Sequence, residues 1–442
     1  MKNLITFYEH QTIKFEELKE CLKLNKNEIV KIFKTINKTN IVKDNEDKEY
    51  NGIFKIYYDK IKAKQYVGFA VVDNKIIQVL PKVFKDCGYK DKNIIIAFIK
   101  MMNLAYNLNI KEQELTKVRN INSTSAIHEV FIYLFSYSLL NEIKNGFYKE
   151  YVKIREEKKF LKGKLLINKQ IRKLPHQKHK FSIEYYEFTE NNILNQIFYY
   201  TTYISLKKTK WKTNKKLLSE LMLIFDGISL RRINIHDFKR VSFTRLNERF
   251  KKSFNLAKII LSAFGEIEKE DTIGFFVDMN DLFEKFIYSI LKREFKIKYQ
   301  DKFKMFIDNE LYGIKNIDQK PDYVIYKDNS PLLILDAKYK EIKKDEKGKI
   351  ILPADLLRQA YTYAKYYSLK HNKNANIILI FPKSKNYNNF DNNIIVGKGV
   401  FFDDKTKLYV LTYDLEKLII SNGIDKEFIK NIKSLIRRLS KN

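Results

Sequence analysis

The sequence of 442 residues contains little cysteine, proline or glycine, and these shortages exclude several kinds of protein. Its two cysteines, Cys21 and Cys87, are too few for a disulfide framework, a four-thiolate zinc site or an iron–sulfur cluster. With 13 Gly and 6 Pro it has no long flexible linker. No apolar run reaches the roughly 18 residues that a transmembrane helix needs, and Met1–His10 lacks a signal-peptide pattern. We therefore expect a reduced, cytoplasmic protein with no membrane association.

Positive charge is abundant: Lys and Arg number 84 against 53 Asp and Glu, which gives a formal net charge of +31. Such an excess attracts phosphate backbones through sequence-independent, salt-sensitive contacts. An AT-rich genome, which favours Lys, Asn and Ile codons, explains part of the same excess. The charge favours nucleic-acid binding, but only a chemical site can assign a function.

The hydrophobic period changes along the chain and predicts three domains of an α/β protein (α+β over the whole chain). Strand-like alternation over 49–84 predicts a β-rich domain at 1–115. Helical spacing predicts a helical middle region at 116–270, whose basic stretch at 158–180 either binds phosphates or is a solvated surface. Residues 271–442 predict a mixed sheet flanked by helices. In this last part we expect helices at 280–294, 354–369 and 424–439, and strands near 303–308, 322–326, 332–338, 376–381, 398–402 and 407–413.

The segment from Pro321 to Lys338 is the most informative for chemistry. It contains two apolar stretches that read as strands, joined by residues 327–331, which have the composition of a turn. We therefore predict a hairpin with directly opposed side chains about 4.5–5.5 Å apart. The expected pairs are Tyr326 with Leu332, Val324 with Ile334, and Asp322 with Asp336.

Asp322 and Asp336 would repel each other in this hairpin unless a cation lay between them. Lys338, two residues beyond Asp336, projects from the same face of its strand. Mg²⁺ prefers carboxylate and carbonyl oxygens; when bound, it polarises a scissile phosphate and lowers the pKa of an attacking water. Lys338 could orient that water. The alternative is an ordinary solvated Asp–Lys pair, although the apolar run at 332–335 makes charged groups there costly to bury.

Two predicted helices carry further candidates. Glu284, near the start of the helix at 280–294, could reach the metal, although Asp281 and Glu284 also resemble a helix capping box. Gln359 and Tyr363 lie four residues apart, on one face of the helix at 354–369. They could contact DNA phosphates or brace the metal site, or they could form a plain polar helix face.

These residues together resemble the PD-(D/E)xK nuclease superfamily: Glu284, Pro321-Asp322, Asp336-Ala337-Lys338, and the pair Gln359 and Tyr363. Other strings resemble the McrC family, the nuclease subunits of McrBC-type modification-dependent restriction systems. They are Gly68, Gln78 to Lys82, Gly163-Lys164-Leu165, Phe188 to Asn195, Thr244 to Asn247, and Leu282-Phe283-Glu284. The resemblance spans residues 50 to 415, and the first fifty residues match nothing recognisable.

The resemblance implies an endonuclease that cuts double-stranded DNA when docked to a hexameric AAA+ GTPase. In that family the motor recognises modified cytosine, such as 5-methylcytosine, and the nuclease subunit stimulates GTP hydrolysis through its N-terminal region. Asp322, Asp336 and the Ala337 carbonyl would bind Mg²⁺, and Lys338 would be the catalytic lysine. The sequence has no G-x-x-x-x-G-K-[ST] loop, so a partner would have to hydrolyse the GTP.

Two other functions remain open from the sequence. The chain could be a stand-alone PD-(D/E)xK repair nuclease that needs metal but no nucleotide. It could also be a catalytically inert adaptor that binds DNA or activates the GTPase. Nuclease assays with and without the motor would separate these possibilities.

Overall fold

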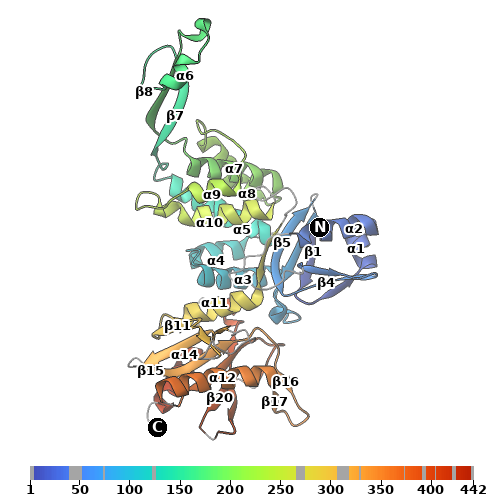
Figure 1. The fold of residues 1–442 in the computed structure, drawn as a ribbon. Helices are drawn as coiled ribbons and strands as arrows, with labels where there is room; N and C mark the ends of the chain where they lie inside the picture. The colour runs from blue at the N-terminus through green and yellow to red at the C-terminus, as the bar shows by residue number, and fades with distance from the viewer. Residues whose placement is uncertain are drawn as a thin grey trace, which may run out of the picture. The chain divides into compact units, whose positions relative to one another are not determined.

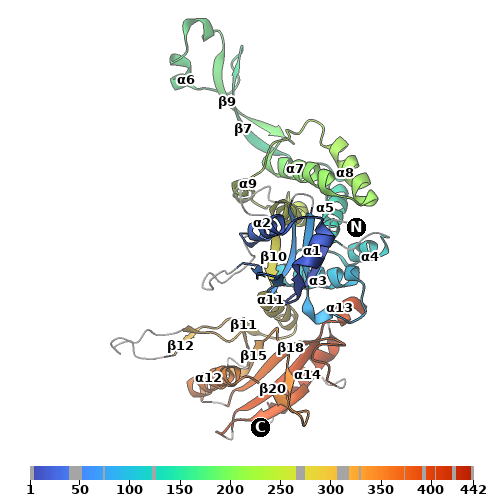
Figure 2. The same cartoon turned by 90° about the vertical axis from the view of Figure 1, so that its right-hand side faces the viewer.

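A computed structural model describes most of the chain (Figures 1 and 2). The described residues form two compact units, Met1–Ile127 together with Phe275–Asn442, and His128–Gly274. No helix among these residues is both long and apolar enough to cross a membrane. The described ranges are 4–38, 52–72, 75–121, 126–264, 274–305, 318–327, 330–372, 374–390, 395–403, 405–420 and 425–439.

Helices and strands are mixed, which confirms the expected α/β class. The middle of the chain separates from the rest close to the expected boundaries, whereas the first and last parts share one compact unit. The division into domains at 1–115, 116–270 and 271–442 stays a prediction.

The sheets at the N-terminal part of the first unit contain the predicted strands and three that the sequence did not reveal, β1, β2 and β10. One sheet has the order β1-β6-β5-β10 and a smaller one has the order β2-β4-β3. β6 ends at Leu80 because Pro81 has no N–H to donate to a ladder. The strands are β1 (Leu4–Tyr8), β2 (Thr12–Lys14), β3 (Phe54–Ile56), β4 (Lys60–Ala63), β5 (Tyr66–Val72), β6 (Lys75–Leu80) and β10 (Phe275–Asp278).

Strand β10 joins the N-terminal sheet to the C-terminal part of the chain. It pairs antiparallel with β5, with Phe276 opposite Gly68, and α11 (Met279–Leu291) begins directly after it. Because α11 follows β10 without a break, the pairing of β10 in the sheet fixes the position at which α11 starts. Helix α11 then packs on α3. The helices before the second unit are α1 (Phe15–Leu22), α2 (Lys26–Asn37), α3 (Asp91–Tyr106) and α4 (Glu112–Asn120), with a 3₁₀ turn η1 at Lys82–Phe84.

The second unit is built on helices whose contacts centre on α7. Buried Glu129 holds the bundle together, because its carboxylate accepts hydrogen bonds from Lys210 N at 2.6 Å and Asn214 Nδ2 at 2.8 Å. The elements are α5 (Ile127–Ile143), α7 (Ile193–Lys208), α8 (Lys212–Ile224), α9 (Ile235–Arg240), α10 (Lys251–Ala263) and the 3₁₀ turn η3 (Glu248–Phe250).

Besides these helices, the second unit contains a β-arm that the sequence did not predict. Figure 1 shows the arm extending from the helices of its own unit. Strand β7 alternates between exposed and half-buried residues, so it carries no buried stripe that a sequence could reveal, and β9 buries only Ser182, Ile183 and Tyr185. Cross-strand charge pairs also stabilise the two strands: Glu184 contacts Lys153 at 2.8 Å and Arg155 at 2.6 Å. The arm comprises β7 (Glu150–Lys158), β8 (Lys164–Leu165), α6 (Ile167–Ile171), η2 (Pro175–Gln177) and β9 (Phe181–Thr189).

The C-terminal part has the expected mixed sheet, in the order β11-β14-β15-β18-β20-β19. β15, β18 and β20 are parallel, and the outer strands are antiparallel. Figure 2 shows α12 (Ala354–His371) and α14 (Lys426–Leu439) on opposite sides of this sheet. The strands are β11 (Ile297–Tyr299), β14 (Tyr323–Lys327), β15 (Ser330–Ala337), β18 (Asn376–Lys383), β19 (Ile395–Val400) and β20 (Lys407–Asp414).

Alternate residues of each strand face the two helical layers. Val324, Ile334 and Leu379 pack in one core with α12. On the other face, Tyr413 contacts Phe286 of α11 and Phe428 of α14. The expected strand at 303–308 is present as β12 (Phe303–Lys304), paired with β13 (Asp318–Gln319), and its later residues lie outside the described ranges. The remaining elements are β16 (Lys343–Lys344), β17 (Ile350–Ile351) and α13 (Lys417–Ile420).

Candidate active site

The predicted hairpin is formed by β14 and β15. Val324 lies opposite Ile334, as expected, but Tyr326 pairs with Pro331 rather than with Leu332. The register shifts between Ile325 and Tyr326, so Leu332 is an additional residue on its strand, which is a β-bulge. Pro331 has no N–H and cannot extend the regular ladder. The bulge lies at the turn end, so the register at the other end is the predicted one.

Asp322 and Asp336 meet at that other end of the hairpin. Asp322 directly precedes β14, and its Oδ2 accepts a hydrogen bond from the Ala337 backbone N–H at 2.7 Å. Asp336 lies within β15, where only 1% of its surface is exposed. Its Oδ2 contacts Lys338 Nζ at 2.7 Å. Its Oδ1 is buried and accepts no hydrogen bond from any residue that the structure describes.

The charges of this group are strongly coupled. Burial and the negative charge of Asp336 raise the pKa of Asp322 well above its usual value, despite the opposing influence of Lys338. Burial alone would lower the pKa of Lys338, but the charges of Asp336 and Asp322 outweigh it and raise that pKa. Lys338 is therefore held as an ammonium ion. One ammonium does not compensate both carboxylates, which leaves the site favourable to a further cation.

Glu284 approaches the same site from α11. Its carboxylate Oε1 accepts a hydrogen bond from Gln300 Nε2 at 2.8 Å, and burial raises its pKa. The capping-box interpretation of Asp281 and Glu284 was wrong, because Asp278 caps α11 by accepting from Asn280 N at 2.9 Å. Glu284 is therefore free of a capping role.

Gln300 is a site residue that the sequence did not reveal. Besides holding Glu284, it donates its backbone N–H to the carbonyl oxygen of Asp322 at 2.9 Å. Its φ of 50° places it in the left-handed region, where the chain turns after β11. A single glutamine after a three-residue strand gives no pattern in the sequence, so only the fold identifies it.

Gln359 and Tyr363 brace the hairpin from α12. Gln359 Nε2 donates to the Tyr363 hydroxyl at 2.7 Å. That hydroxyl donates to the carbonyl oxygen of Lys320 at 3.1 Å, two residues before Asp322. Of the expected roles, this geometry supports bracing of the carboxylate segment.

All the predicted site residues line one cavity of about 570 Å³. Among the described residues, no group of three or more His, Cys, Asp or Glu is arranged to hold a metal ion. Mg²⁺ does not require such a group, because it is commonly held by one or two carboxylates and keeps several waters. Asp322, the free Oδ1 of Asp336 and the Ala337 carbonyl fit that requirement. Glu284, which Gln300 positions through its Oε1, could bind the ion directly or through one of its waters. The lining residues predicted from the sequence are Glu284, Asp322, Asp336, Ala337, Lys338, Gln359 and Tyr363.

Comparisons with known proteins bear on the family and the fold of the chain. Residues 61–382 match the family described as McrBC 5-methylcytosine restriction system component. The structure is similar to a chain of the half-complex from a tetradecameric assembly of Thermococcus gammatolerans McrB AAA+ hexamers with bound McrC. The two share 37% identity with a TM-score of 0.74, over 97% of this chain and 100% of that chain.

A second similar chain comes from the cryo-EM structure of the Thermococcus gammatolerans McrBC complex. It is 44% identical, with a TM-score of 0.51, over 66% of this chain and 87% of that chain. No curated protein matches the sequence. From the family match and the likeness over nearly its whole length, the chain belongs to the McrBC restriction-system family, as a component of the McrC type.

Proposed function

We propose that this chain is the Mg²⁺-dependent DNA endonuclease subunit of a GTP-dependent restriction complex directed at modified cytosine. It would act in the cytoplasm, docked to a hexameric AAA+ GTPase. One observation carries the proposal: Asp322, Asp336 and Lys338 meet at the open end of one hairpin, in a cavity large enough for a phosphate group.

The residues of the site have separate tasks in phosphodiester hydrolysis. A bound Mg²⁺ would polarise the scissile phosphate and acidify an attacking water. Lys338 stays protonated, so it acts by donating hydrogen bonds to that water or to a phosphate oxygen and not as a base. Asp336 fixes the lysine through their 2.7 Å contact. Tyr363 holds the backbone ahead of Asp322.

The partner in this proposal is supported by the family relationship. The related Thermococcus chain belongs to an assembly of McrB AAA+ hexamers with bound McrC. The present sequence contains no G-x-x-x-x-G-K-[ST] loop, the element that cradles nucleotide phosphates in such motors. Nuclease and motor would therefore reside on different chains.

The test is cleavage of plasmid DNA carrying methylated cytosines, with the cognate GTPase, GTP and Mg²⁺ present. Asp336→Asn should cut at least about a hundredfold more slowly, because it removes the charge that would hold Mg²⁺ and that fixes Lys338 beside the reacting phosphate. Glu346→Gln, an exposed acid of the same part of the chain, is the control and should cut normally.

Three outcomes would count against the proposal. If Asp336→Asn cuts at the wild-type rate, the assignment of the site is wrong. If wild-type protein cuts with Mg²⁺ but without nucleotide or partner, a stand-alone nuclease is favoured. If no metal-dependent cutting occurs with the cognate motor present, the chain is an adaptor without nuclease activity.

A further inference from the structure

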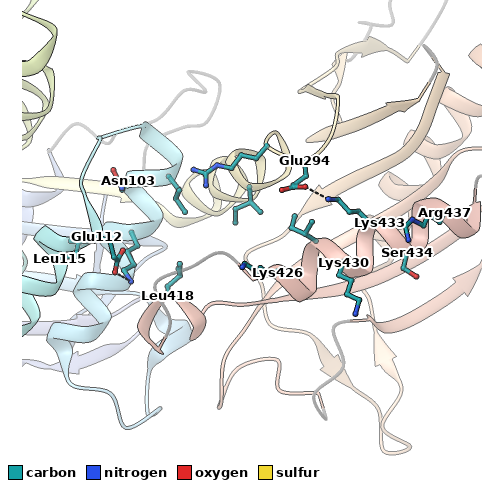
Figure 3. A pocket seen from close by; sticks show the side chains of 15 residues that line it. Asn103, Glu112, Leu115, Glu294, Leu418, Lys426, Lys430, Lys433, Ser434 and Arg437 are labelled. Carbon is teal, nitrogen blue, oxygen red and sulfur yellow. Dashed lines mark hydrogen bonds and ion pairs between the residues drawn. The ribbon is translucent and has the colours of Figure 1, made fainter.

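A second cavity, of about 910 Å³, lies beside the C-terminal end of α11 (Figure 3). Its walls come from α3, α4, α11, α13 and α14 of the first unit. Among the described residues, it shares no lining residue with the active-site cavity. It is therefore a separate feature, to which the proposed cleavage chemistry assigns no role.

The lining combines an aliphatic surface with positive charge. Most of the apolar lining is buried: Leu115, Ile290, Leu418 and Ile429, together with half-buried Leu104. Around it stand six cationic side chains and only two acidic ones. The cations are Lys100, Arg293, Lys426, Lys430, Lys433 and Arg437.

Both acids of the cavity are already paired. Glu112 contacts Lys100 at 2.8 Å, and Glu294 contacts Lys433 at 2.5 Å (Figure 3). For the other four cations, no carboxylate of the described residues lies within ion-pair distance. The cavity therefore presents uncompensated positive charge beside apolar surface.

The fold of α14 directs these charges to the cavity. Lys426, Lys430, Lys433 and Arg437 follow one another at four-, three- and four-residue steps, which places them on one helix face. Over this span the helix rises about 16 Å. Its opposite face is held in the core by buried residues, so the helix cannot turn the cations away. These residues are Phe428, Ile432 and Leu435.

We propose that this cavity binds a nucleotide unit, with its phosphate at the α14 cations and its sugar and base against the aliphatic surface. A purely inorganic anion would use only the charges, and a neutral apolar ligand would leave the cations unused. The choice of a nucleotide among organic phosphates rests on the proposed function, because a DNA-cutting protein meets nucleotides as substrate and product. A free nucleotide and an unpaired nucleotide of a DNA strand both present a phosphate, a sugar and a base, so either of them could occupy the cavity.

The length of the cation row predicts which of these two sources binds more tightly. A single phosphate occupies only part of a row about 16 Å long, whereas successive phosphates of a strand engage several of its members. We expect a short single-stranded oligonucleotide to bind more tightly than deoxyadenosine monophosphate, and the latter more tightly than inorganic phosphate. Equal binding of all three would overturn the proposal in favour of non-specific anion attraction.

The experiment measures equilibrium binding of these three probes to the full chain in EDTA, so that no DNA is cut. The double variant Lys430→Glu, Arg437→Glu should weaken oligonucleotide binding at least about tenfold. The double variant Lys31→Glu, Lys34→Glu on α2 changes the net charge equally, at exposed positions outside the cavity. It should change binding less than about twofold. An equal loss in both would overturn the proposal, since general charge would then explain the binding.

A second pair of variants fills the cavity without changing its charge. Leu104→Trp introduces bulk from α3, and Ser434→Trp introduces it from α14. Each should weaken nucleotide binding, and a melting curve verifies that at least one of them is folded. Wild-type affinity in a folded filling variant would contradict the site.

The binding test of this cavity and the cleavage test of the proposed nuclease function can fail independently of each other. Glu346→Gln, the exposed control of the cleavage test, lies outside both cavities and should bind all three probes like the wild type. If cutting is never observed but the cavity variants lose binding, only the nuclease proposal fails. If cutting follows the proposal but the cavity variants bind normally, only the present inference fails.

Discussion

Glu9 offers a sharp test of how the N-terminal sheet is joined to the catalytic part. It directly follows β1 and is buried, with 3% of its surface exposed. Its Oε2 accepts hydrogen bonds from Lys82 N and from the Tyr339 hydroxyl, each at 3.0 Å. Tyr339 follows the proposed catalytic lysine. Burial raises the pKa of Glu9 from 4.5 to about 8, with Asp278 adding to the increase and Lys82 opposing it.

The raised pKa fixes the sign and size of the effect of replacing this residue. Below pH 4.5 the folded and unfolded states both hold the proton, and Glu9 adds no pH dependence. Between pH 4.5 and about 8 only the folded state holds it, so the free energy of unfolding falls as the pH rises. At 1.36 kcal/mol per pH unit, the full loss is about 5 kcal/mol above pH 8. Glu9→Gln, which resembles the protonated acid, removes this loss.

The assay is urea denaturation of wild type and Glu9→Gln at pH 5.5 and pH 8.5. The free energy of unfolding of the variant should exceed that of wild type by roughly 1 kcal/mol at pH 5.5 and by roughly 5 kcal/mol at pH 8.5. Comparing the two proteins cancels the contributions of other groups that titrate in this interval. If the stability difference does not change with pH, Glu9 is not a buried neutral acid and the reasoning fails.

Three further substitutions have clear expected outcomes. Gly68→Ala would place a Cβ 2.0 Å from the carbonyl oxygen of Phe275. The substitution should therefore separate β10 from β5 and lower the free energy of unfolding by about 1–3 kcal/mol or more. A melting temperature equal to that of wild type would refute this. Gln300→Ala releases Glu284 and should raise the Mg²⁺ concentration for half-maximal cutting about tenfold, while an unchanged Mg²⁺ dependence would remove Gln300 from the site. Lys338→Gln should slow cutting at least about a hundredfold with DNA affinity nearly unchanged, and a loss confined to DNA binding would contradict its assigned role.

The hairpin could be predicted from the sequence because its information is local. Two apolar strands joined by a short turn fix their own register, and the fixed alternation of side chains places both acids on one face. The error at Tyr326 came from a bulge at Leu332, where Pro331 interrupts the ladder. That irregularity depends on backbone pairing, which residue types alone do not specify.

The features that sequence reasoning missed all depend on distant parts of the chain. β10 pairs with β5, roughly two hundred residues earlier in the chain. The sequence of such a short strand does not indicate which other strand it pairs with. Gln300 contributes through one side-chain contact and one backbone contact. In the arm, β7 is held to β9 partly by charge pairs, and β7 lacks the alternation of buried and exposed residues that reveals other strands.

The central claim is that Asp322 and Asp336 share a divalent cation beside Lys338. Anomalous diffraction from crystals of the protein grown with Mn²⁺ tests it most directly. We predict a metal peak at about 2.1 Å from an oxygen of each carboxylate, and its loss in Asp336→Asn crystals grown under the same conditions. A fully occupied metal peak elsewhere, in protein that cuts DNA with Mn²⁺, would contradict the account.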